Sequence, residues 1–231
     1  MTDEKGLVDF HSHILPGADH GSSSVETSIY QLDQAEIHGI NRVIATPHFY
    51  PHRHTVGSFL KRRDDAYKAL MSRYKGGVEL RLGAEAMLCD GFDSLPDLDK
   101  LFIYGTKTLL LELPYDGFKV EYCDTVSKII NNGVDVILAH ADRYPQENIE
   151  KLLKCGARLQ LNTSPLCRII KRRELFTWID EKKVVALGSD IHGRDKKAYG
   201  RFVRAASKIG ENISYIKAES DLVWSQSKEY L

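Results

Sequence analysis

The stretch Val134-Asp-Val-Ile-Leu-Ala139 indicates the fold class of this 231-residue chain. Its hydrophobicity is nearly continuous rather than alternating, as it is in Leu109-Leu-Leu111. Such runs are typical of strands that are covered on both faces, in a parallel sheet or barrel. Segments with helical periodicity separate most of these runs, so the sequence predicts an α/β fold of repeated βα units. The seven strand candidates are Leu7 to Phe10, Val43 to Ala45, Val78 to Leu82, Leu109 to Leu113, Val134 to Ala139, Leu159 to Leu161 and Val184 to Leu187. They predict a (β/α) barrel of about seven strands.

End signals place several helices between these strands. The motif Ser23-x-x-Glu26 resembles a capping box, which would begin a helix, and Gly39 and Gly133 fall where helices would end. The segment 55–75 carries apolar side chains among many charges, which indicates an amphipathic surface helix.

Length and charge restrict the class of protein. A barrel of this length would form one domain over residues 1–231, with the polar motifs in 7–192 and the last helices or a tail in 193–231. Lys and Arg total 32, as do Asp and Glu, so no overall field favours nucleic acid or an anionic membrane. The short apolar runs and the polar N-terminus predict a cytoplasmic protein with neither a spanning helix nor a secretory signal. An oligomeric state does not follow from the sequence.

The cysteines are expected to pack as reduced thiols. Cys89, Cys123, Cys155 and Cys167 have no paired spacing typical of metal sites. Cys167 and Arg173 match the C-x5-R spacing of cysteine-dependent phosphatases, but no glycine lies between them to form a phosphate-cradling turn. We therefore interpret this segment as a helix end.

Acid and histidine clusters close five of the apolar runs. Packing alone gives no reason to repeat polar side chains at equivalent strand ends, where a barrel brings its functional groups together. Histidine and carboxylate ligands suit divalent metals of intermediate hardness, so a multinuclear metal site is the leading hypothesis. The clusters are Asp9-Phe-His11-Ser-His13, Thr46-Pro-His48, Gly83-Ala-Glu85, Ala139-His140 and Ser189-Asp190-Ile-His192.

Single residues of these clusters differ in how strongly they indicate a ligand. His11 and His13 would point to the same side of a regular strand and could share one ion. Glu85 and Glu112 follow apolar runs, where a carboxylate is costly unless it is paired or coordinating, although a salt bridge would also satisfy it. A lone histidine such as His48 is more often a hydrogen-bonded core residue than a ligand.

The coincidence of five such sites favours ligation for His48, His140, Asp190 and His192. His38 lies at an expected helix end, where the helix dipole explains it. His52 and His54 lie in a loop and are expected to be solvated, although both could approach a substrate.

The motifs together resemble the PHP (polymerase and histidinol phosphatase) superfamily, and most closely its metal-dependent protein tyrosine phosphatases of bacterial capsule and exopolysaccharide operons. The matching stretches occur in family order over residues 7 to 192: Asp9-Phe-His-Ser-His-Ile-Leu-Pro-Gly-Ala-Asp-His-Gly21, Ile44-Ala-Thr-Pro-His48, Gly83-Ala-Glu85, Leu110-Leu-Glu-Leu-Pro114, Leu138-Ala-His-Ala-Asp-Arg-Tyr144, Leu159-Gln-Leu-Asn-Thr-Ser164 and Gly188-Ser-Asp-Ile-His192.

The resemblance implies a distorted, TIM-barrel-like (β/α)7 PHP barrel that holds three divalent metals, usually with manganese dependence. By position the ligands would be His11, His13, His48, Glu85, Glu112, His140, Asp190 and His192.

Three positions depart from the family pattern. Gly17-Ala-Asp19-His20-Gly21 has a histidine where the family has a metal-binding carboxylate. His20 or Asp19 could ligate, and the histidine could either shift the metal preference towards zinc or iron or weaken one site. Asp142-Arg143-Tyr144 replaces Glu-Arg-Tyr but keeps the arginine. The basic residue after the last histidine is Lys197, with Arg194 nearby, rather than an arginine in register.

Phosphomonoester hydrolysis suits such a site. Adjacent divalent ions would acidify a shared water, and the resulting hydroxide would attack phosphorus in line. Arg143 is the candidate phosphate clamp, with Lys197 or Arg194 as a second cation. A phenol leaves with a pKa of about 10 and needs less acid assistance than an alkoxide, so an aryl phosphate is a sensible substrate. The resemblance implies that the partner is the phosphotyrosine tail of a bacterial tyrosine kinase.

Alternative functions use the same residues differently. The chain could be a small-molecule phosphatase of the histidinol-phosphate type, because a fold does not fix a substrate. It could be an inactive regulator that binds phosphotyrosine or metal, with His20 as the mark of lost activity, or an amidohydrolase-like barrel that leaves Arg143 without its role. A nuclease activity is disfavoured by the neutral charge.

Overall fold

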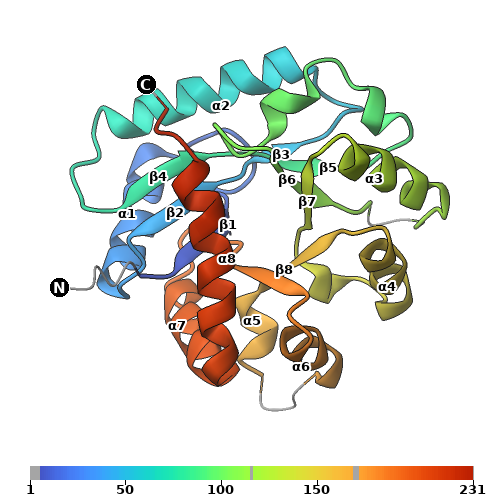
Figure 1. The fold of residues 1–231 in the computed structure, drawn as a ribbon. Coiled ribbons are helices and arrows are strands. Elements are labelled where there is room, and N and C mark those ends of the chain that lie inside the picture. The colour runs from blue at the N-terminus through green and yellow to red at the C-terminus, as the bar shows by residue number, and fades with distance from the viewer. Residues whose placement is uncertain (1–5, 115–116, 169–171, 231) are drawn as a thin grey trace.

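The computed structural model describes residues 6–114, 117–168 and 172–230 as parallel strands surrounded by helices (Figure 1). One sheet has the strand order β1-β2-β4 and the other has the order β3-β5-β6-β7-β8-β9, with parallel pairing throughout. The strands are β1 (Val8–Ser12), β2 (Arg42–Ala45), β3 (His48–Phe49), β4 (Glu79–Leu82), β5 (Glu85–Met87), β6 (Thr108–Glu112), β7 (Asp135–Leu138), β8 (Arg158–Asn162) and β9 (Val184–Gly188). The α/β class predicted from the sequence is confirmed.

Helices follow most of the strands. The α-helices are α1 (Val25–Ile37), α2 (Val56–Met71), α3 (Glu121–Asn131), α4 (Gln146–Lys154), α5 (Thr163–Leu166), α6 (Arg173–Asp180), α7 (Ala198–Ile209) and α8 (Ile213–Gln226), and short 3-10 turns are η1 (Phe92–Ser94), η2 (Leu98–Leu101), η3 (Ala141–Arg143) and η4 (Gly210–Asn212). The tail after residue 193 is thus largely helical. No helix in the described ranges combines the length and the apolar character needed to cross a bilayer.

The two sheets continue one another. The backbone N–H of Gly83 donates to the carbonyl of Ala45 (2.9 Å), and that of Glu85 donates to Pro47 (3.1 Å), so β3 and β5 extend the lines of β2 and β4. Each of the seven predicted runs therefore overlaps one strand position. Beyond β9, Asp190 N–H donates to the carbonyl of His11 in β1 (2.9 Å). The last strand thus ends beside the first, and full closure of the barrel stays a prediction.

Helix ends follow local capping chemistry. Gly39 and Gly133 end α1 and α3 with positive φ angles of 74° and 80°, as the sequence predicted. The capping-box prediction at Ser23 is wrong by one residue. Ser24 has the extended backbone of an N-cap, and its hydroxyl accepts the N–H of Thr27 at 3.2 Å.

Buried side chains on both faces explain the continuous hydrophobic runs. In β6, Leu109 and Leu111 pack in the large core under the helices, whereas Leu110 packs in a second cluster with Phe10 and Ile137. Helix α8, red in Figure 1, contacts β1 and β9 and adds its apolar side chains to that second cluster. The carboxyl ends of the strands, where the polar motifs lie, are left for the functional site.

Candidate metal centre

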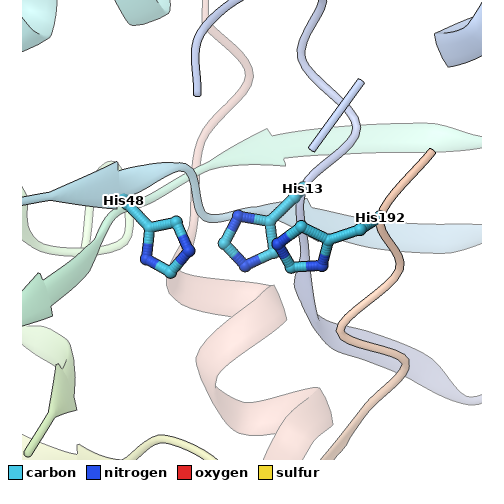
Figure 2. Close-up of side chains that lie close together, drawn as sticks. All are labelled: His13, His48 and His192. Carbon is cyan, nitrogen blue, oxygen red and sulfur yellow. The ribbon is translucent and has the colours of Figure 1, made fainter. Parts of the chain in front are cut away.

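Side chains from the carboxyl ends of most strands meet in one buried cluster. Parallel strands present these ends at the same edge, which is why motifs far apart in the sequence become neighbours. Figure 2 shows three of the rings, from three separate segments, lying side by side: those of His13, His48 and His192. The predicted ligands that the structure brings together are His11, His13, His48, Glu85, Glu112, His140, Asp190 and His192.

Four ligand atoms of the cluster surround one point. His11 Nε2 and His13 Nε2 are 3.0 Å apart, and each is 3.2 Å from Glu85 Oε2. Asp190 Oδ1 lies 3.4 Å from His13 Nε2 and 3.7 Å from His11 Nε2. Ligands held about 2.0–2.2 Å from a common ion lie about 2.8–3.6 Å apart, depending on the coordination geometry. His11, His13 and Glu85 therefore fit around one divalent ion, and Asp190 lies at the limit of this range.

Glu85 extends the cluster towards two further groups. Its Oε2 lies 2.8 Å from His48 Nδ1, and its Oε1 lies 2.6 Å from His140 Nε2. Glu112 Oε2 is 3.7 Å from His48 Nδ1, and its Oε1 is 3.6 Å from His140 Nε2. His13, His48 and His192 form another set with ligand atoms within 4.8 Å of one another. Glu85 belongs to two of these groups, and the two oxygens of a carboxylate can serve neighbouring ions, as a multinuclear centre requires.

Unpaired polar atoms show that the cluster fits metal ions. His48 Nδ1, Glu85 Oε2, Glu112 Oε2 and His192 Nε2 are buried without a hydrogen-bond partner. His48 Nδ1 and Glu85 Oε2 are close together, yet their geometry is not that of a hydrogen bond. A buried polar atom left unsatisfied costs about 1–3 kcal/mol. Coordination would satisfy these atoms together, so the donor set fits a divalent ion.

Hydrogen bonds on the far side of three imidazoles turn the near nitrogen towards the centre. Nδ1 of His11 lies 3.1 Å from Gln160 Oε1, and Nδ1 of His13 lies 2.7 Å from Asp19 Oδ2. Nδ1 of His192 lies 3.0 Å from a backbone carbonyl oxygen. Each partner accepts, so Nδ1 carries the proton and Nε2 presents its lone pair.

Gln160 and Asn162 of β8 are functional candidates that the sequence analysis did not assign. Gln160 Oε1 also accepts the backbone N–H of His140 (2.7 Å), and Gln160 Nε2 donates to Asn162 Oδ1 (3.0 Å). Asn162 Nδ2 in turn donates to Asp190 Oδ2 (2.8 Å). Two polar residues two apart in an apolar strand were the available signal, because they face the same side. Together they connect His11 with Asp190.

Asp19 acts as an anchor within its loop. Besides its contact with His13, its Oδ2 accepts the backbone N–H of His48 (2.9 Å), and its Oδ1 accepts that of Gly21 (2.8 Å). A Cβ at Gly21 would lie 2.3 Å from His13 Cβ, so only glycine allows this approach. These contacts give Asp19 a role in orienting His13.

His20 lies at the exposed margin of the centre. Its ring stacks over that of His48 with a centroid distance of 4.8 Å, and it is also 4.8 Å from the ring of His192. Among the described residues, no set of three candidate ligands with atoms within 4.8 Å of one another includes His20. Ligation by His20 therefore stays a prediction.

The backbone is strained at two of the candidate ligands. His140 has a φ of 33° and Asp190 a φ of 50°, in the left-handed region that residues other than glycine rarely adopt. Such strain persists only where the surroundings fix it, and it is concentrated at functional sites.

Electrostatics of the cluster favour bound positive charge. Burial alone would raise the pKa of Asp190, but His11, His13 and Arg143 hold it well below its ordinary value. Burial opposes a charge on His13, yet its carboxylate partners raise its pKa well above the ordinary value. The buried carboxylates are therefore stabilised by positive charge close to them. Burial and the neighbouring His13 lower the pKa of His192 to about 4, which keeps that imidazole neutral and able to ligate.

The three predicted phosphate-binding residues differ in their position relative to the metal centre. Arg143, in η3, is half exposed and its Nη2 contacts Asp190 Oδ2 at the edge of the centre. Arg194 lies over the ring of Tyr30 in α1, with 5.6 Å from its Cζ to the ring centroid. Lys197 is exposed at the start of α7, and within the described parts of the chain its side chain has no contact with the cluster. Roles for Lys197 and Arg194 stay predictions.

Of the histidines outside the cluster, His38 and His52 match their expected environments, whereas His54 is half-buried rather than solvated. His38 caps α1, with Nδ1 2.8 Å from the carbonyl of Gln34. His52 is exposed and accepts Arg53 Nε–H at 3.1 Å. His54 lines a hollow of about 330 Å³ that also reaches His20.

The cysteine-phosphatase alternative gains no support from Cys167. Its thiol donates to the carbonyl of Arg201 (3.1 Å), and burial raises its pKa, so a thiolate nucleophile is disfavoured. Cys167 ends α5, as the interpretation of a helix end requires. Residues 169–171 of the C-x5-R segment lie outside the described residues.

The sequence matches a known protein family over most of its length. A family model described as "Capsular polysaccharide synthesis, CpsB/CapC" matches residues 7–220. The tyrosine-protein phosphatase CpsB of Streptococcus agalactiae serotype V (strain ATCC BAA-611 / 2603 V/R) is 24% identical over 226 residues, covering 88% of this chain and 89% of the relative. The tyrosine-protein phosphatase YwqE of Bacillus subtilis (strain 168) is 25% identical over 202 residues, covering 80% and 77%.

Solved structures share the fold. One, from work on YwqE of Bacillus subtilis and CpsB of Streptococcus pneumoniae described as unique metal-dependent tyrosine phosphatases, superimposes with a TM-score of 0.77 at 21% identity, covering 97% of this chain and 96% of the other. The phosphotriesterase homology protein of Escherichia coli gives a TM-score of 0.57 at 14% identity, covering 95% and 99%.

Proposed function

Because the chain belongs to the capsular polysaccharide synthesis family CpsB/CapC, we propose that it is a metal-dependent protein tyrosine phosphatase that hydrolyses phosphoric monoesters. One observation carries this proposal. Four buried atoms at the strand ends have no hydrogen-bond partner, and they lie among side chains with the spacing of metal ligands: His48 Nδ1, Glu85 Oε2, Glu112 Oε2 and His192 Nε2. Polar groups in that state are costly in a protein that has no use for metal.

Eight side chains would hold the metal. His11, His13, Glu85 and Asp190 would hold one ion, and Glu112, His48 and His140 would hold another beside Glu85. His192, which lies beside His13 and His48, would contribute to a further ion. Mixed histidine and carboxylate ligands suit manganese, and zinc or iron remain compatible with them. Bound divalent ions would supply Lewis acidity towards water and the phosphate oxygens.

Arg143 would bind the phosphate of the substrate. It stands at the rim, half exposed, and its planar guanidinium can bind two phosphate oxygens at once. A phenol with a pKa of about 10 departs without a strong general acid. Two aromatic hydroxyls lie near the centre, those of Tyr144 and of Tyr50, whose ring stacks on His48. The Tyr144 hydroxyl is engaged with the carbonyl of Leu113 (3.1 Å), and burial raises the pKa of both tyrosines, so neither is a strong general acid. A tyrosyl leaving group therefore suits these residues better than an alkoxide.

The proposed physiological substrate is the phosphotyrosine tail of a bacterial tyrosine kinase that controls capsule or exopolysaccharide synthesis in the cytoplasm. Relatives of this chain are named tyrosine-protein phosphatase CpsB and putative tyrosine-protein phosphatase CapC, and the matching family model is described as capsular polysaccharide synthesis. The chain itself would act as a single PHP domain, without nucleic acid or membrane insertion.

The test measures phosphate release by chelator-stripped protein resupplied with manganese, zinc or iron. Turnover of a phosphotyrosine peptide that depends on metal and survives thiol alkylation would support the proposal. Turnover of histidinol phosphate alone would replace it with a metabolic phosphatase. Phosphopeptide binding without release under any metal would indicate a regulator.

A further inference from the structure

A hollow lined by arginines opens beside the metal centre. It has a volume of about 550 Å³ and shares the rim residues Arg143 and Asp190 with the centre. Specific small-ligand pockets have volumes of about 300–1,000 Å³. The hollow is thus large enough for a further side chain of a peptide whose phosphotyrosine occupies the centre. Its charged lining comprises Arg143, Arg168, Arg172, Arg201, Asp142, Asp190 and Asp195.

The cations of this hollow exceed what its acids can neutralise. Of the four arginines, Arg172 is already paired with Glu174. Of the three aspartates, Asp190 is one of the proposed metal ligands, so its charge belongs to the centre. Three arginines thus face two carboxylates. Arg168 is exposed, and in the described ranges its guanidinium has no ion pair or hydrogen bond. Arg201 contacts Asp195 through Nη2, but its Nε is buried without a hydrogen-bond partner. The exposed guanidinium of Arg168 is therefore available to an anion, and Arg201 adds a second positive charge.

The other hollow beside the centre offers an anion fewer free donors. The hollow around His20 and His48 has about 330 Å³ and contains two arginines. Arg62 donates Nε–H to the carbonyl of Ala18 (2.6 Å), and Arg53 lies over the ring of Tyr50. Both guanidinium groups are thus already engaged, so an anion finds its better site beside Arg143.

We propose that the arginine hollow binds a second anionic group of the substrate, a carboxylate or phosphate on a residue near the phosphotyrosine. This inference rests on the proposed phosphatase function and adds a substrate class to it, namely acidic or multiply phosphorylated peptides. Side chains two residues apart on an extended peptide point to the same side, so one can enter the hollow while the phosphotyrosine occupies the centre. Arg168 supplies the charge-assisted hydrogen bonds, and Arg201 adds positive charge to the hollow.

The test compares phosphotyrosine peptides flanked on both sides by Glu, Gln, Lys or a second phosphotyrosine, with para-nitrophenyl phosphate as a substrate without flanks. In manganese-loaded wild-type protein, kcat/KM for the Glu peptide should exceed that for the Lys peptide about 10-fold, as one charge-assisted hydrogen bond implies. The Glu and phosphotyrosine arms separate the two sources of the anion. Added salt should reduce the preference.

A charge-reversal variant tests whether Arg168 causes the preference for acidic flanks. Arg168→Glu should abolish the preference for acidic flanks and leave turnover of para-nitrophenyl phosphate unchanged. The matched control is Arg204→Glu, which changes an exposed arginine of α7 outside the hollow and should keep the preference. Equal kcat/KM for Glu and Lys peptides in the wild type, or a preference that survives Arg168→Glu, would overturn the inference.

Binding measurements separate this inference from the proposed function. Peptides that carry a non-hydrolysable phosphonomethyl-phenylalanine should bind the manganese-loaded protein with the same dependence on flanking charge and on Arg168. A flank-dependent affinity without any turnover would retain the anion subsite and reject the phosphatase. Turnover that does not depend on flanking charge would retain the phosphatase and reject the anion subsite. Failure of both binding and turnover would reject the subsite and the phosphatase together.

Discussion

At the scale of single residues, the centre depends on side chains that do not themselves face the proposed ions. Gln160 bonds to His11 across 149 residues of sequence, and Asn162 bonds to Asp190 across 28. Each fixes the orientation of a ligand whose other atoms point to the centre. Partners of this kind affect metal affinity by about 10- to 100-fold when they are removed.

Replacing Gln160 should therefore weaken metal binding. In Gln160→Leu, the Nδ1–H of His11 and the backbone N–H of His140 lose their shared acceptor, so the imidazole of His11 is no longer held in one orientation. We expect manganese affinity, measured by competition with a chelator, to fall about 10- to 100-fold. Gln146→Leu, at an exposed position in α4, is the matched control and should bind manganese normally. An unchanged affinity in Gln160→Leu would remove Gln160 from the positioning role.

Alanine substitution of a proposed metal ligand and of the proposed phosphate-binding arginine should have different effects. His140→Ala removes a nitrogen 2.6 Å from Glu85 Oε1 and should lower both the metal content and the activity. Arg143→Ala should retain the metal content but raise KM for a phosphotyrosine peptide about 10-fold, since it removes a charge-assisted contact. Elemental analysis and steady-state kinetics of both variants check this. Full activity in both would contradict the site assignment.

At the scale of elements, the ends of parallel strands must approach closely for the ligands to meet. Gly188 ends β9, which contacts both β1 and β8. A Cβ at this position would lie 2.6 Å from His11 Cβ and 2.6 Å from Gln160 Nε2. Glycine here allows the last strand, the first strand and β8 to come together under the centre.

Gly188→Ala should therefore disturb both stability and metal binding. Overpacking of this kind costs about 1–3 kcal/mol, and relief by a strand shift would move His11. Urea unfolding and manganese titration measure the two effects. Gly57→Ala in α2 is the control, because its Cβ meets nothing within 4 Å, and it should stabilise the protein by about 0.5–1 kcal/mol. A Gly188→Ala protein with normal stability and affinity would show that the strand ends tolerate separation.

At the scale of the whole molecule, the charged centre lies where the apolar core ends. Buried carboxylates and imidazoles at the strand ends compensate one another only in part, as the unpaired atoms of Glu85 and His48 show. Bound cations would complete this compensation and join segments from β1 to the end of β9. Metal should thus act on global stability as well as on chemistry.

Metal removal should lower the thermal stability of the protein. A ligand that binds only the folded state stabilises it by about 2.7 kcal/mol at 100 times its Kd, so Tm should rise with manganese concentration. Thermal scans of chelator-stripped protein across a manganese series measure this. His38→Ala, outside the cluster, should keep the full shift, whereas His11→Ala should lose most of it. A Tm that is independent of manganese would mean that the cluster does not hold the ion in the folded state.

The sequence by itself determined the α/β class, the seven strand positions and the set of residues that meet at the strand ends. Hydrophobic periodicity is a local property, and parallel strands bring their carboxyl ends to one edge whatever the details of packing. The prediction from sequence placed the N-cap of α1 one residue too early, because Ser23 and Ser24 are both good caps and only the backbone angle decides between them.

Only the tertiary structure decided how these residues work together. The Gln160–Asn162 connection, the anchoring role of Asp19 and the position of His20 at the margin depend on distances between segments that are remote in sequence. The arginine hollow has the same origin, since Arg143, Arg168 and Arg201 come from three separate segments. Spacing along a chain does not encode such approaches, because they follow from how the strands and helices pack against one another.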